Sequence, residues 1–524
     1  MKHIRVIILG FSIFTFIQCA NAQLVFQRYL IGETSVEIYD LEPTSDGGFI
    51  GVGTDFTGSY YNILLVRFNS TGDPVWTKSY GYANNNHGIS VKETFDNGFI
   101  IANDAPINTF DFGLLKTDIN GNLIWAKNYG GNGAERVSDV QQCTDSGYVL
   151  TGYSTSYGAG LKDIYVVKTD ILGNLEWSKT YGGTDEDKGN SIQQTADGGF
   201  IICGDTRSFG AGSEDIYIIK TDDMGDTIWT KTYGGIYGEF GVDIEVTGNG
   251  NYVVTGRTES FGTLGTDLYL IKIDSNGNLI WEKTYGSSTS IEYANDVLAT
   301  TDGGYITVGQ IGSLPVYDFF IVKTDSIGDT LWTKRFDSGF NDQRPSVQQT
   351  IDGGYIILGN AVDVINSKIR SYLYTIKVDS NGNGACNSVI TNTVVNNGFS
   401  SVSSGSFLAS GGIESTLVMN EYNLGMIDSI ICGIVSLNDI NMDIINLEII
   451  PNPFNYKSTI HFKNINNEVH QILLFDIQGH LVYQISDITT SKVDIYRNNL
   501  SPGIYIAQLY SKDKIKGVCK LIIE

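Results

Sequence analysis

Asp215-Ile-Tyr-Ile-Ile-Lys-Thr-Asp-Asp-Met-Gly-Asp-Thr-Ile-Trp-Thr-Lys-Thr-Tyr233 is one copy of a segment that recurs along the chain. This recurrence is the strongest indication of the fold. Each copy consists of two apolar runs of strand length joined by a turn that is rich in Asp and Gly. The six Trp residues of the protein stand in these copies, 49–52 residues apart: Trp76, Trp125, Trp177, Trp229, Trp281 and Trp332. We interpret them as structural markers of a repeat.

Two further markers keep the same phase as the Trp residues. A turn of the form Asp-Gly-Gly-aromatic, or a close variant, begins seven times, at Asp46, Asp96, Asp145, Asp197, Asn249, Asp302 and Asp352. A basic residue near the end of an apolar run recurs seven times, at Arg67, Lys116, Lys168, Lys220, Lys272, Lys323 and Lys377. Each repeat therefore predicts four short strands joined as a meander.

Four-stranded units in about seven copies predict an all-β fold, a seven-bladed β-propeller over residues 23–385. The seventh repeat has no Trp strand, whereas Phe26-Gln-Arg-Tyr-Leu30 copies the Trp-x-Lys-x-Tyr pattern ahead of the first repeat. We therefore expect the N-terminal strand to complete the last blade and to close the ring. The repeat resembles the bacterial seven-bladed propeller repeat of secreted proteins, which implies a fold and leaves the activity open.

Residues 1–22 have the features of a secretory signal peptide. Lys2 and Arg5 precede an apolar run, and Ala20-Asn-Ala22 supplies small residues for cleavage before Gln23. Lipidation at Cys19 is the alternative, although the residues before it are not small. No later segment holds about 18 uninterrupted apolar residues, so we expect no transmembrane segment.

Residues 446–524 alternate apolar and polar positions between turn residues, which predicts a small Ig-like β-sandwich. Four motifs follow in order: Pro451-Asn-Pro-Phe454, Asp476-Ile-Gln-Gly479, Leu500-Ser-Pro-Gly-Ile-Tyr505 and Lys520-Leu-Ile-Ile523. With them the segment closely resembles the type A C-terminal sorting domain of type IX secretion cargo, known from Bacteroidota. The resemblance implies the secretion machinery as a partner and export through the periplasm to the cell surface or the medium.

Residues 386–445 are rich in Ser and Asn, which predicts a linker between the propeller and the C-terminal β-sandwich. Cys386 and Cys432 bracket much of this segment, and a disulfide between them is one of two open alternatives. The segment holds five acidic residues and no basic one, which marks it off from the sorting segment.

The net charge of −24 excludes whole classes of partner. It repels phosphate backbones and anionic lipid headgroups, so we expect no nucleic acid and no membrane surface as a partner. Residues 446–524 hold eight Lys or Arg against seven Asp or Glu, so the acidity belongs to the middle of the chain. We expect a monomer.

The connections between strands two and three and between blades are long and variable, and they share one face of the predicted propeller. Binding residues concentrate on such loops. From this face we select Tyr157, Arg207, Phe209, Arg257 and Phe261 as candidate ligand contacts. The alternative is that each aromatic side chain covers the rim of its own blade, since the aromatics recur with the repeat.

The sequence predicts no catalytic residue and no cofactor. The predicted propeller holds one His, His87, in an Asn-rich loop, and no nucleophile elbow or zinc-binding helix is present. The Asp-x-Asn-Gly-Asn runs at Asp118, Asp274 and Asp379 suggest calcium, but their Gly comes too early for an EF-hand. We read them as turns, with calcium as the alternative.

These observations favour a secreted, non-enzymatic module that binds a glycan, a peptide or a protein. One alternative is an extracellular polysaccharide hydrolase or lyase with carboxylates over the propeller axis. The other is a passive adhesion or spacer component. A carboxylate pair that departs from the repeat would favour the enzyme.

Overall fold

The computed structural model describes residues 25–523 with short gaps. The gaps are residues 33–34, 57–59, 82–84, 107–109, 264, 314, 366–367, 385–387, 391–393, 398–400, 404–406, 410–412, 417–419, 424–425, 435–446, 451–452, 463, 465–468, 476–480, 498–499 and 512–513. The chain forms two compact units, residues 1–434 and 435–524.

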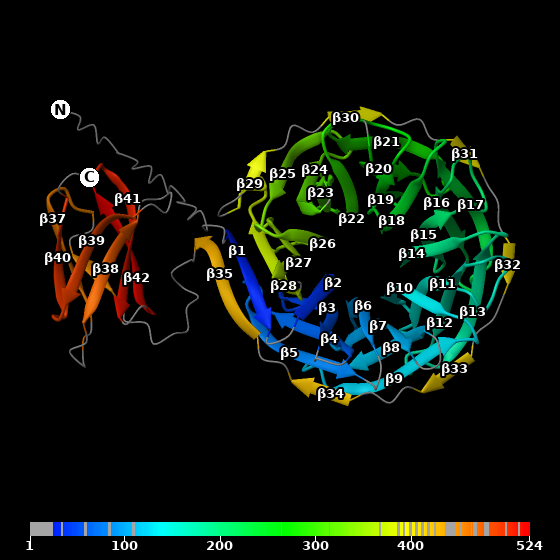
Figure 1. The fold of residues 1–524 in the computed structure, drawn as a ribbon, viewed down its shortest axis with the longest axis horizontal. Coiled ribbons are helices and arrows are strands. Elements are labelled where there is room, and N and C mark those ends of the chain that lie inside the picture. The colour runs from blue at the N-terminus through cyan, green and yellow to red at the C-terminus, as the bar shows by residue number, and fades with distance from the viewer. Residues whose placement is uncertain are drawn as a thin grey trace, which may run out of the picture. The chain divides into compact units, whose positions relative to one another are not determined.

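The first unit is a ring of antiparallel sheets around a central axis (Figure 1). Its described residues form seven such sheets; in six of them the chain runs through four consecutive strands from the axis outward, and in the seventh β1 follows three consecutive strands. The blades are β2 (Ser35–Pro43), β3 (Phe49–Phe56), β4 (Tyr61–Phe68) and β5 (Pro74–Gly81) in blade 1; β6 (His87–Glu93), β7 (Phe99–Pro106), β8 (Phe110–Thr117) and β9 (Leu123–Gly130) in blade 2; β10 (Glu135–Gln142), β11 (Tyr148–Ser154), β12 (Asp163–Thr169) and β13 (Leu175–Gly182) in blade 3; β14 (Asp187–Gln194), β15 (Phe200–Thr206), β16 (Asp215–Thr221) and β17 (Thr227–Gly234) in blade 4; β18 (Glu239–Val246), β19 (Tyr252–Thr258), β20 (Asp267–Ile273) and β21 (Leu279–Gly286) in blade 5; β22 (Ile291–Ala299), β23 (Tyr305–Ser313), β24 (Val316–Thr324) and β25 (Thr330–Phe336) in blade 6; and β26 (Asn341–Gln349), β27 (Tyr355–Ile365), β28 (Lys368–Val378) and β1 (Val25–Gly32) in blade 7.

The predicted seven-bladed propeller and its closure are confirmed. The N-terminal strand β1 pairs antiparallel with β28, so both ends of the repeat array meet in blade 7 (Figure 1). Buried hydrophobic clusters lie between neighbouring sheets; one of them joins Ile50 and Leu65 of blade 1 to Val91 and Leu115 of blade 2. The ring is therefore held by packing between blades as well as by pairing within them.

The repeated Trp packs on the next blade. In blade 4, the ring of Trp229 lies against Gly277, in the turn between strands three and four of blade 5, so that a Cβ on Gly277 would stand 2.9 Å from it. The same contact joins Trp76 to Gly121, Trp125 to Gly173, Trp177 to Gly225, Trp281 to Gly328 and Trp332 to Gly382. Blade 7 has no Trp, and there Phe26 of β1 takes the place against Gly72 of blade 1. The same apolar contact thus recurs at every blade boundary.

The other residues of the Trp-x-Lys-x-Tyr pattern bind the same turn. The hydroxyl of Tyr233, which is fully buried, donates a hydrogen bond to the carbonyl of Gly277 at 2.6 Å. In the same way the Lys283 ammonium reaches the Asp329 carboxylate of the next turn at 2.7 Å. We call this set of contacts, the Trp ring on the turn glycine with the Lys and Tyr bonds beside it, the blade clamp.

A second recurring contact lies within six of the seven blades; in blade 5, Asn249 stands in place of the Asp. The buried Lys220 ammonium of strand three binds the Asp197 carboxylate of the first turn at 3.0 Å. Burial alone would raise the pKa of Asp197, but hydrogen bonds from Thr195, Lys220 and the Gly199 N–H lower it. Equivalent ion pairs are Arg67 with Asp46, Lys116 with Asp96, Lys168 with Asp145, Lys323 with Asp302 and Lys377 with Asp352. In these six blades the second and third sequence markers are therefore partners of each other.

A fifth strand lies on the outer edge of every blade, and all of these strands come from residues 388–434 (Figure 1). They are β29 (Ser388–Ile390) on blade 6, β30 (Val394–Asn397) on blade 5, β31 (Ser401–Ser403) on blade 4, β32 (Phe407–Ala409) on blade 3, β33 (Ile413–Thr416) on blade 2, β34 (Asn420–Asn423) on blade 1 and β35 (Met426–Ile434) on blade 7. We call this segment the belt. The sequence predicted a linker over residues 386–445, and half of these residues lie in the seven belt strands. Cys386 and the side chain of Cys432 lie outside the described residues, so the disulfide between them stays a prediction.

The second unit consists of two small sheets. One contains β36 (Glu448–Ile450), β37 (Lys457–His461) and β40 (Lys492–Tyr496), and the other contains β39 (Leu481–Ile488), β38 (His470–Phe475), β41 (Gly503–Ser511) and β42 (Lys514–Ile523). Ile460 and Ile495 of the first sheet share a buried cluster with Leu474 and Leu509 of the second. The predicted small β-domain is confirmed.

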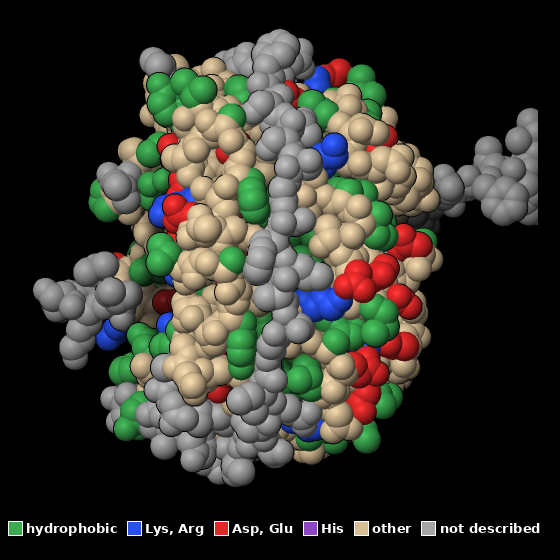
Figure 2. Space-filling view, turned by 90° about the vertical axis from the view of Figure 1, so that its right-hand side faces the viewer, with side chains coloured by type: hydrophobic (Ala, Val, Ile, Leu, Met, Phe, Trp, Pro, Cys, Tyr) green, Lys and Arg blue, Asp and Glu red, His purple; other side chains and the backbone are tan. Residues whose placement is uncertain are grey.

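The surface of the ring is acidic. Figure 2 shows Asp and Glu side chains gathered along one rim among hydrophobic side chains, with fewer Lys and Arg in view. This agrees with the net charge of −24. Within the described residues, no helix is long and apolar enough to cross a membrane.

Replacing Gly277 with alanine should destabilise the propeller more than replacing Gly303. Both glycines have a positive φ, +74° and +84°, so both substitutions strain the backbone, but only the new Cβ at 277 would strike the clamp residues Trp229 and Lys231. We expect an additional loss of about 1–3 kcal/mol for Gly277→Ala. Urea unfolding followed by Trp fluorescence measures it, since all six Trp residues lie in the propeller. Equal losses would contradict the clamp.

Candidate functional site

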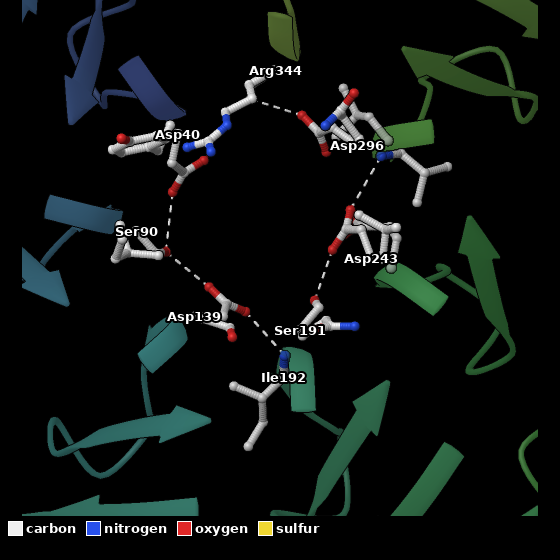
Figure 3. A pocket seen from close by; sticks show the side chains of 18 of the residues that line it. Asp40, Ser90, Asp139, Ser191, Ile192, Asp243, Asp296 and Arg344 are labelled. Atoms are coloured by element: carbon white, nitrogen blue, oxygen red, sulfur yellow. Dashed lines mark hydrogen bonds between the residues drawn. The ribbon is translucent and has the colours of Figure 1, made fainter. Parts of the chain in front are cut away.

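The innermost strand of each blade has a β-bulge at the same place. Its register with the second strand shifts directly before Asp40, Ser90, Asp139, Ser191, Asp243, Asp296 and Ser346. A bulge re-aims the side chain beside it. Figure 3 shows Asp40, Ser90, Asp139, Ser191, Asp243 and Asp296 around the axis. We call the seven positions the axial ring.

The axial ring lines a cavity of about 720 Å³ (Figure 3). Two neighbouring tiers from the same strands line it as well. One tier holds Tyr39, Ile89, Ser138, Asn190, Val242, Asn295 and Pro345, and the other holds Glu42, Lys92, Gln141, Gln193, Glu245, Leu298 and Gln348. Ligand pockets in proteins commonly have this volume.

Hydrogen bonds between blades hold the carboxylates of the axial ring in place. Asp139 of blade 3 accepts a bond from Ser90 Oγ of blade 2 at 2.8 Å and one from the Ile192 N–H of blade 4 at 3.0 Å. Equivalent bonds run from the N–H of Val91 to Asp40, of Val297 to Asp243 and of Val347 to Asp296, at 2.8–3.1 Å. The carboxylates thus fix neighbouring blades to one another and are themselves fixed.

Asp and Ser alternate around the axial ring with one exception. Because seven is odd, complete alternation is impossible, and the exception falls at Asp243 and Asp296, which lie on neighbouring blades. Burial and the nearby charge of Asp243 raise the pKa of Asp296 well above its ordinary value. Burial also raises the pKa of Asp139 to about 6. Burial and the neighbouring carboxylate thus favour the protonated form of Asp296.

The tier that contains Lys92 carries an ion pair and a carboxyl–amide pair. The Lys92 ammonium binds the Glu42 carboxylate at 2.7 Å. Burial would lower the pKa of Lys92, but the charges of Glu42, Asp40 and Asp139 raise it well above its ordinary value. The amide of Gln193 donates to Glu245 at 2.7 Å, and burial raises the pKa of Glu245 to about 7.

Two arginines lie where aromatic rings border the cavity. The guanidinium of Arg257 lies 4.1 Å from the centroid of the Phe240 ring and 5.0 Å from that of Tyr293. Its Nε is buried and has no hydrogen-bond partner in the described part of the chain. Arg344 lies 4.4 Å above the Tyr39 ring and has a φ of +53°, in the left-handed region. Such strain at a bulged position is typical of a functional site.

Of the five ligand contacts predicted from the sequence, only Arg257 lines the cavity. Tyr157, Phe209 and Phe261 pack on a tyrosine of strand three in their own blades, with ring centroids 5.5–5.8 Å apart. This placement matches the alternative reading, in which they cover the rim of the blade. Arg207 is 46% exposed and pairs with Glu214 and Glu186. A role of these four residues in binding stays a prediction.

The axial ring was missed in the sequence, although a signal for it exists. Every member lies six residues before the turn residue of its repeat, as Asp139 lies before Asp145 and Ser191 before Asp197. Because Asp and Ser share this position, neither residue type recurs regularly enough to be seen alone. Comparison of the repeats column by column would have found it.

No calcium ligand set is visible in the described residues, where no group of three or more His, Cys, Asp or Glu is placed to hold a metal ion. In the Asp118 turn, the carboxylate accepts bonds from the N–H groups of Asn120 and Asn122 at 2.9 and 2.8 Å. Asp274 and Asp379 bind their own turns in the same way. Calcium binding at these turns stays an alternative.

Comparison with known families identifies the second unit. Residues 448–524 match the model of the secretion system C-terminal sorting domain. The second unit is a sorting domain. It indicates secretion of the chain to the outer surface or the extracellular space, and its partner is the type IX secretion machinery.

Similarity of the propeller to known proteins is remote. Solved structures that resemble it include a protein of unknown function from Dyadobacter fermentans, at 9% identity and a TM-score of 0.37 over 67% of this chain and 98% of that one. Another is Sqt1 from Chaetomium thermophilum, at 7% identity and a TM-score of 0.35 over 67% and 100%. Likenesses at this level say nothing of function.

A curated relative covers a smaller part of the chain. The regulatory protein FlaEY of Caulobacter vibrioides is 24% identical over 176 residues, which is 29% of this chain and 18% of that protein. The match thus spans less than a fifth of the length of that relative.

Glu245→Gln should make the stability of the propeller less dependent on pH between 5 and 8. The folded protein keeps the Glu245 proton up to a pKa of about 7, against an ordinary value of 4.5, so the wild type loses stability as the pH rises through 7. Gln does not titrate and keeps an oxygen for Gln193. The variant should gain about 1–3 kcal/mol relative to wild type from pH 5 to pH 8.

Urea titrations at both pH values measure this gain. Glu259→Gln is the control, because Glu259 is exposed. Parallel pH profiles for wild type and Glu245→Gln would contradict a raised pKa of this half-buried carboxyl.

Proposed function

We propose that the protein acts outside the cell as a non-enzymatic binding module and that the axial cavity holds its ligand. The observation that carries this proposal is the set of hydrogen bonds that each Asp of the axial ring accepts from a neighbouring blade. They fix the polar groups of a ligand-sized cavity before a ligand arrives, and such preorganisation lowers the entropic cost of binding.

The chemistry of the cavity favours a neutral, hydroxyl-rich ligand such as the end of a glycan. Seven carboxyl groups line it against three basic groups, so an anionic ligand is repelled. The buried Nε of Arg257 is a donor and the buried Oδ1 of Asn295 is an acceptor, and neither has a partner in the described residues. A hydroxyl group both donates and accepts, so a hydroxyl-rich ligand offers partners for both kinds of group.

A polysaccharide hydrolase is the second candidate, and one observation favours it. Asp243 and Asp296 form a neighbouring carboxyl pair at the break in the alternation, and the pKa of Asp296 is strongly raised by burial and by Asp243. Pairs of carboxyl groups with separated pKa values serve glycosidases. Against this, both residues occupy the repeated position and both bind the next blade, as structural members of the ring do.

A glycan and polysaccharide array probed with the purified chain from residue 23 tests the proposal. Retention without shortened products is the expected result. Release of shortened sugars that stops in Asp296→Asn would establish the hydrolase instead. Absence of any retention would refute the glycan ligand and favour a peptide or protein ligand, or a passive spacer role.

Arg257→Ala should weaken retention of any glycan that the array finds by about tenfold or more, because it removes an unpaired donor from the cavity. Arg207→Ala is the matched control, since Arg207 lies outside the lining and pairs with Glu214. Isothermal titration of both variants measures the change. Equal affinities of Arg257→Ala and wild type would place the ligand elsewhere.

A further inference from the structure

The belt follows the blades in reverse order. After blade 7 the chain crosses to blade 6, places one short strand on each blade back to blade 1, and ends on blade 7 with β35 (Figure 1). It therefore makes one complete circuit of the ring. Blade 7, where it ends, is also where the first and last strands of the propeller meet.

The belt keeps one register around the ring. In blades 1 to 5 its strands lie opposite the Tyr of the blade clamp: the partners of Tyr80, Tyr129, Tyr181, Tyr233 and Tyr285 are Glu421, Glu414, Leu408, Val402 and Val395. These belt residues are six or seven positions apart. A constant register at a constant spacing indicates that the segment is built to fit the ring.

The pairing of the belt is most extensive on β1, at the seam where the first and last blades meet. On blades 1 to 6 each belt strand pairs with the last three or four residues of the outer strand. On blade 7, β35 pairs with β1 along the whole of Val25–Gly32, whereas β28 pairs with β1 only from Phe26 to Leu30. The N-terminal strand therefore has more of its length paired with the belt than with its own blade.

We propose that residues 388–434 are a latch that holds the propeller closed at the seam between its first and last blades. A strand held on one edge by five residue pairs gains a second, longer ladder on its other edge, and each net backbone hydrogen bond adds to its stability. The latch also covers the edge that β1 would otherwise expose to other chains.

Closure of the seam is needed for a complete wall of the axial cavity. Asp40 of blade 1 and Ser346 of blade 7 both line it and flank the seam. A ring that opens between these blades loses one wall of the cavity. The latch thus keeps the cavity complete without touching it.

Hydrogen exchange of residues 25–32 in the chain from residue 23 tests the latch. The seam variant carries Ser429→Pro and Ile430→Pro, so that at least one prolyl nitrogen faces β1 and interrupts the ladder. The control carries Val395→Pro and Asn396→Pro on blade 5. We expect exchange of residues 25–32 to accelerate about tenfold or more in the seam variant and to stay at the wild-type rate in the control. No acceleration in the seam variant, or an equal one in both, would overturn the proposal.

If the proline variant fails to fold, a disulfide cross-link between β1 and β35 tests the latch instead. Tyr29 and Ser429 are register partners, so Tyr29→Cys with Ser429→Cys should form a disulfide under mild oxidation and slow the exchange of residues 25–32 below the wild-type rate. Tyr29→Cys with Met426→Cys, three positions out of register, should not form it readily. Failure of the matched pair to cross-link would overturn the latch.

Discussion

The contact of one aromatic ring with one glycine supports the rest of this structure. At each blade boundary, a Trp, or Phe26 at the seam, packs on the turn glycine of the next blade, where any side chain would collide with it. Around that contact, the Tyr hydroxyl and the Lys ammonium bind the same turn. The strand that ends one blade therefore fixes the position of the following one. Repeated at every boundary, this local rule produces a closed ring.

The geometry of the ring in turn creates the candidate site. Closure brings one bulged position from each inner strand to the axis, and the Asp side chains there bind the backbone of the neighbouring blade. The site is therefore made of groups that also hold the ring together. An odd number of blades forces one break in the alternation of Asp and Ser, so the neighbouring pair Asp243 and Asp296 follows from the number of repeats.

The parts that the sequence predicted share a physical cause. The sequence predicted the blades, the closing strand and the sorting domain. Their markers are bulky residues, or turn residues with a special backbone conformation, at fixed spacing, such as Trp229 and the turn at Asp197. The belt strands were not predicted. Most of them have only three or four residues and lie among Ser, Asn and Gly, so their side chains show no alternating pattern that indicates a strand. Such short strands form because they pair with the outer strand of a blade. The axial ring was not predicted because Asp and Ser share one repeated position. Phe209 and its equivalents pack on their own blades, and their role in binding stays a prediction.

Native-state hydrogen exchange of wild type and Trp229→Ala tests most directly whether contacts between blades make the ring one cooperative unit. If they do, strands two and three of all seven blades exchange with a common opening free energy, and loss of the one Trp lowers it in every blade by the same amount. A loss of protection confined to blades 4 and 5 would contradict this, and would show that the blades are stable individually.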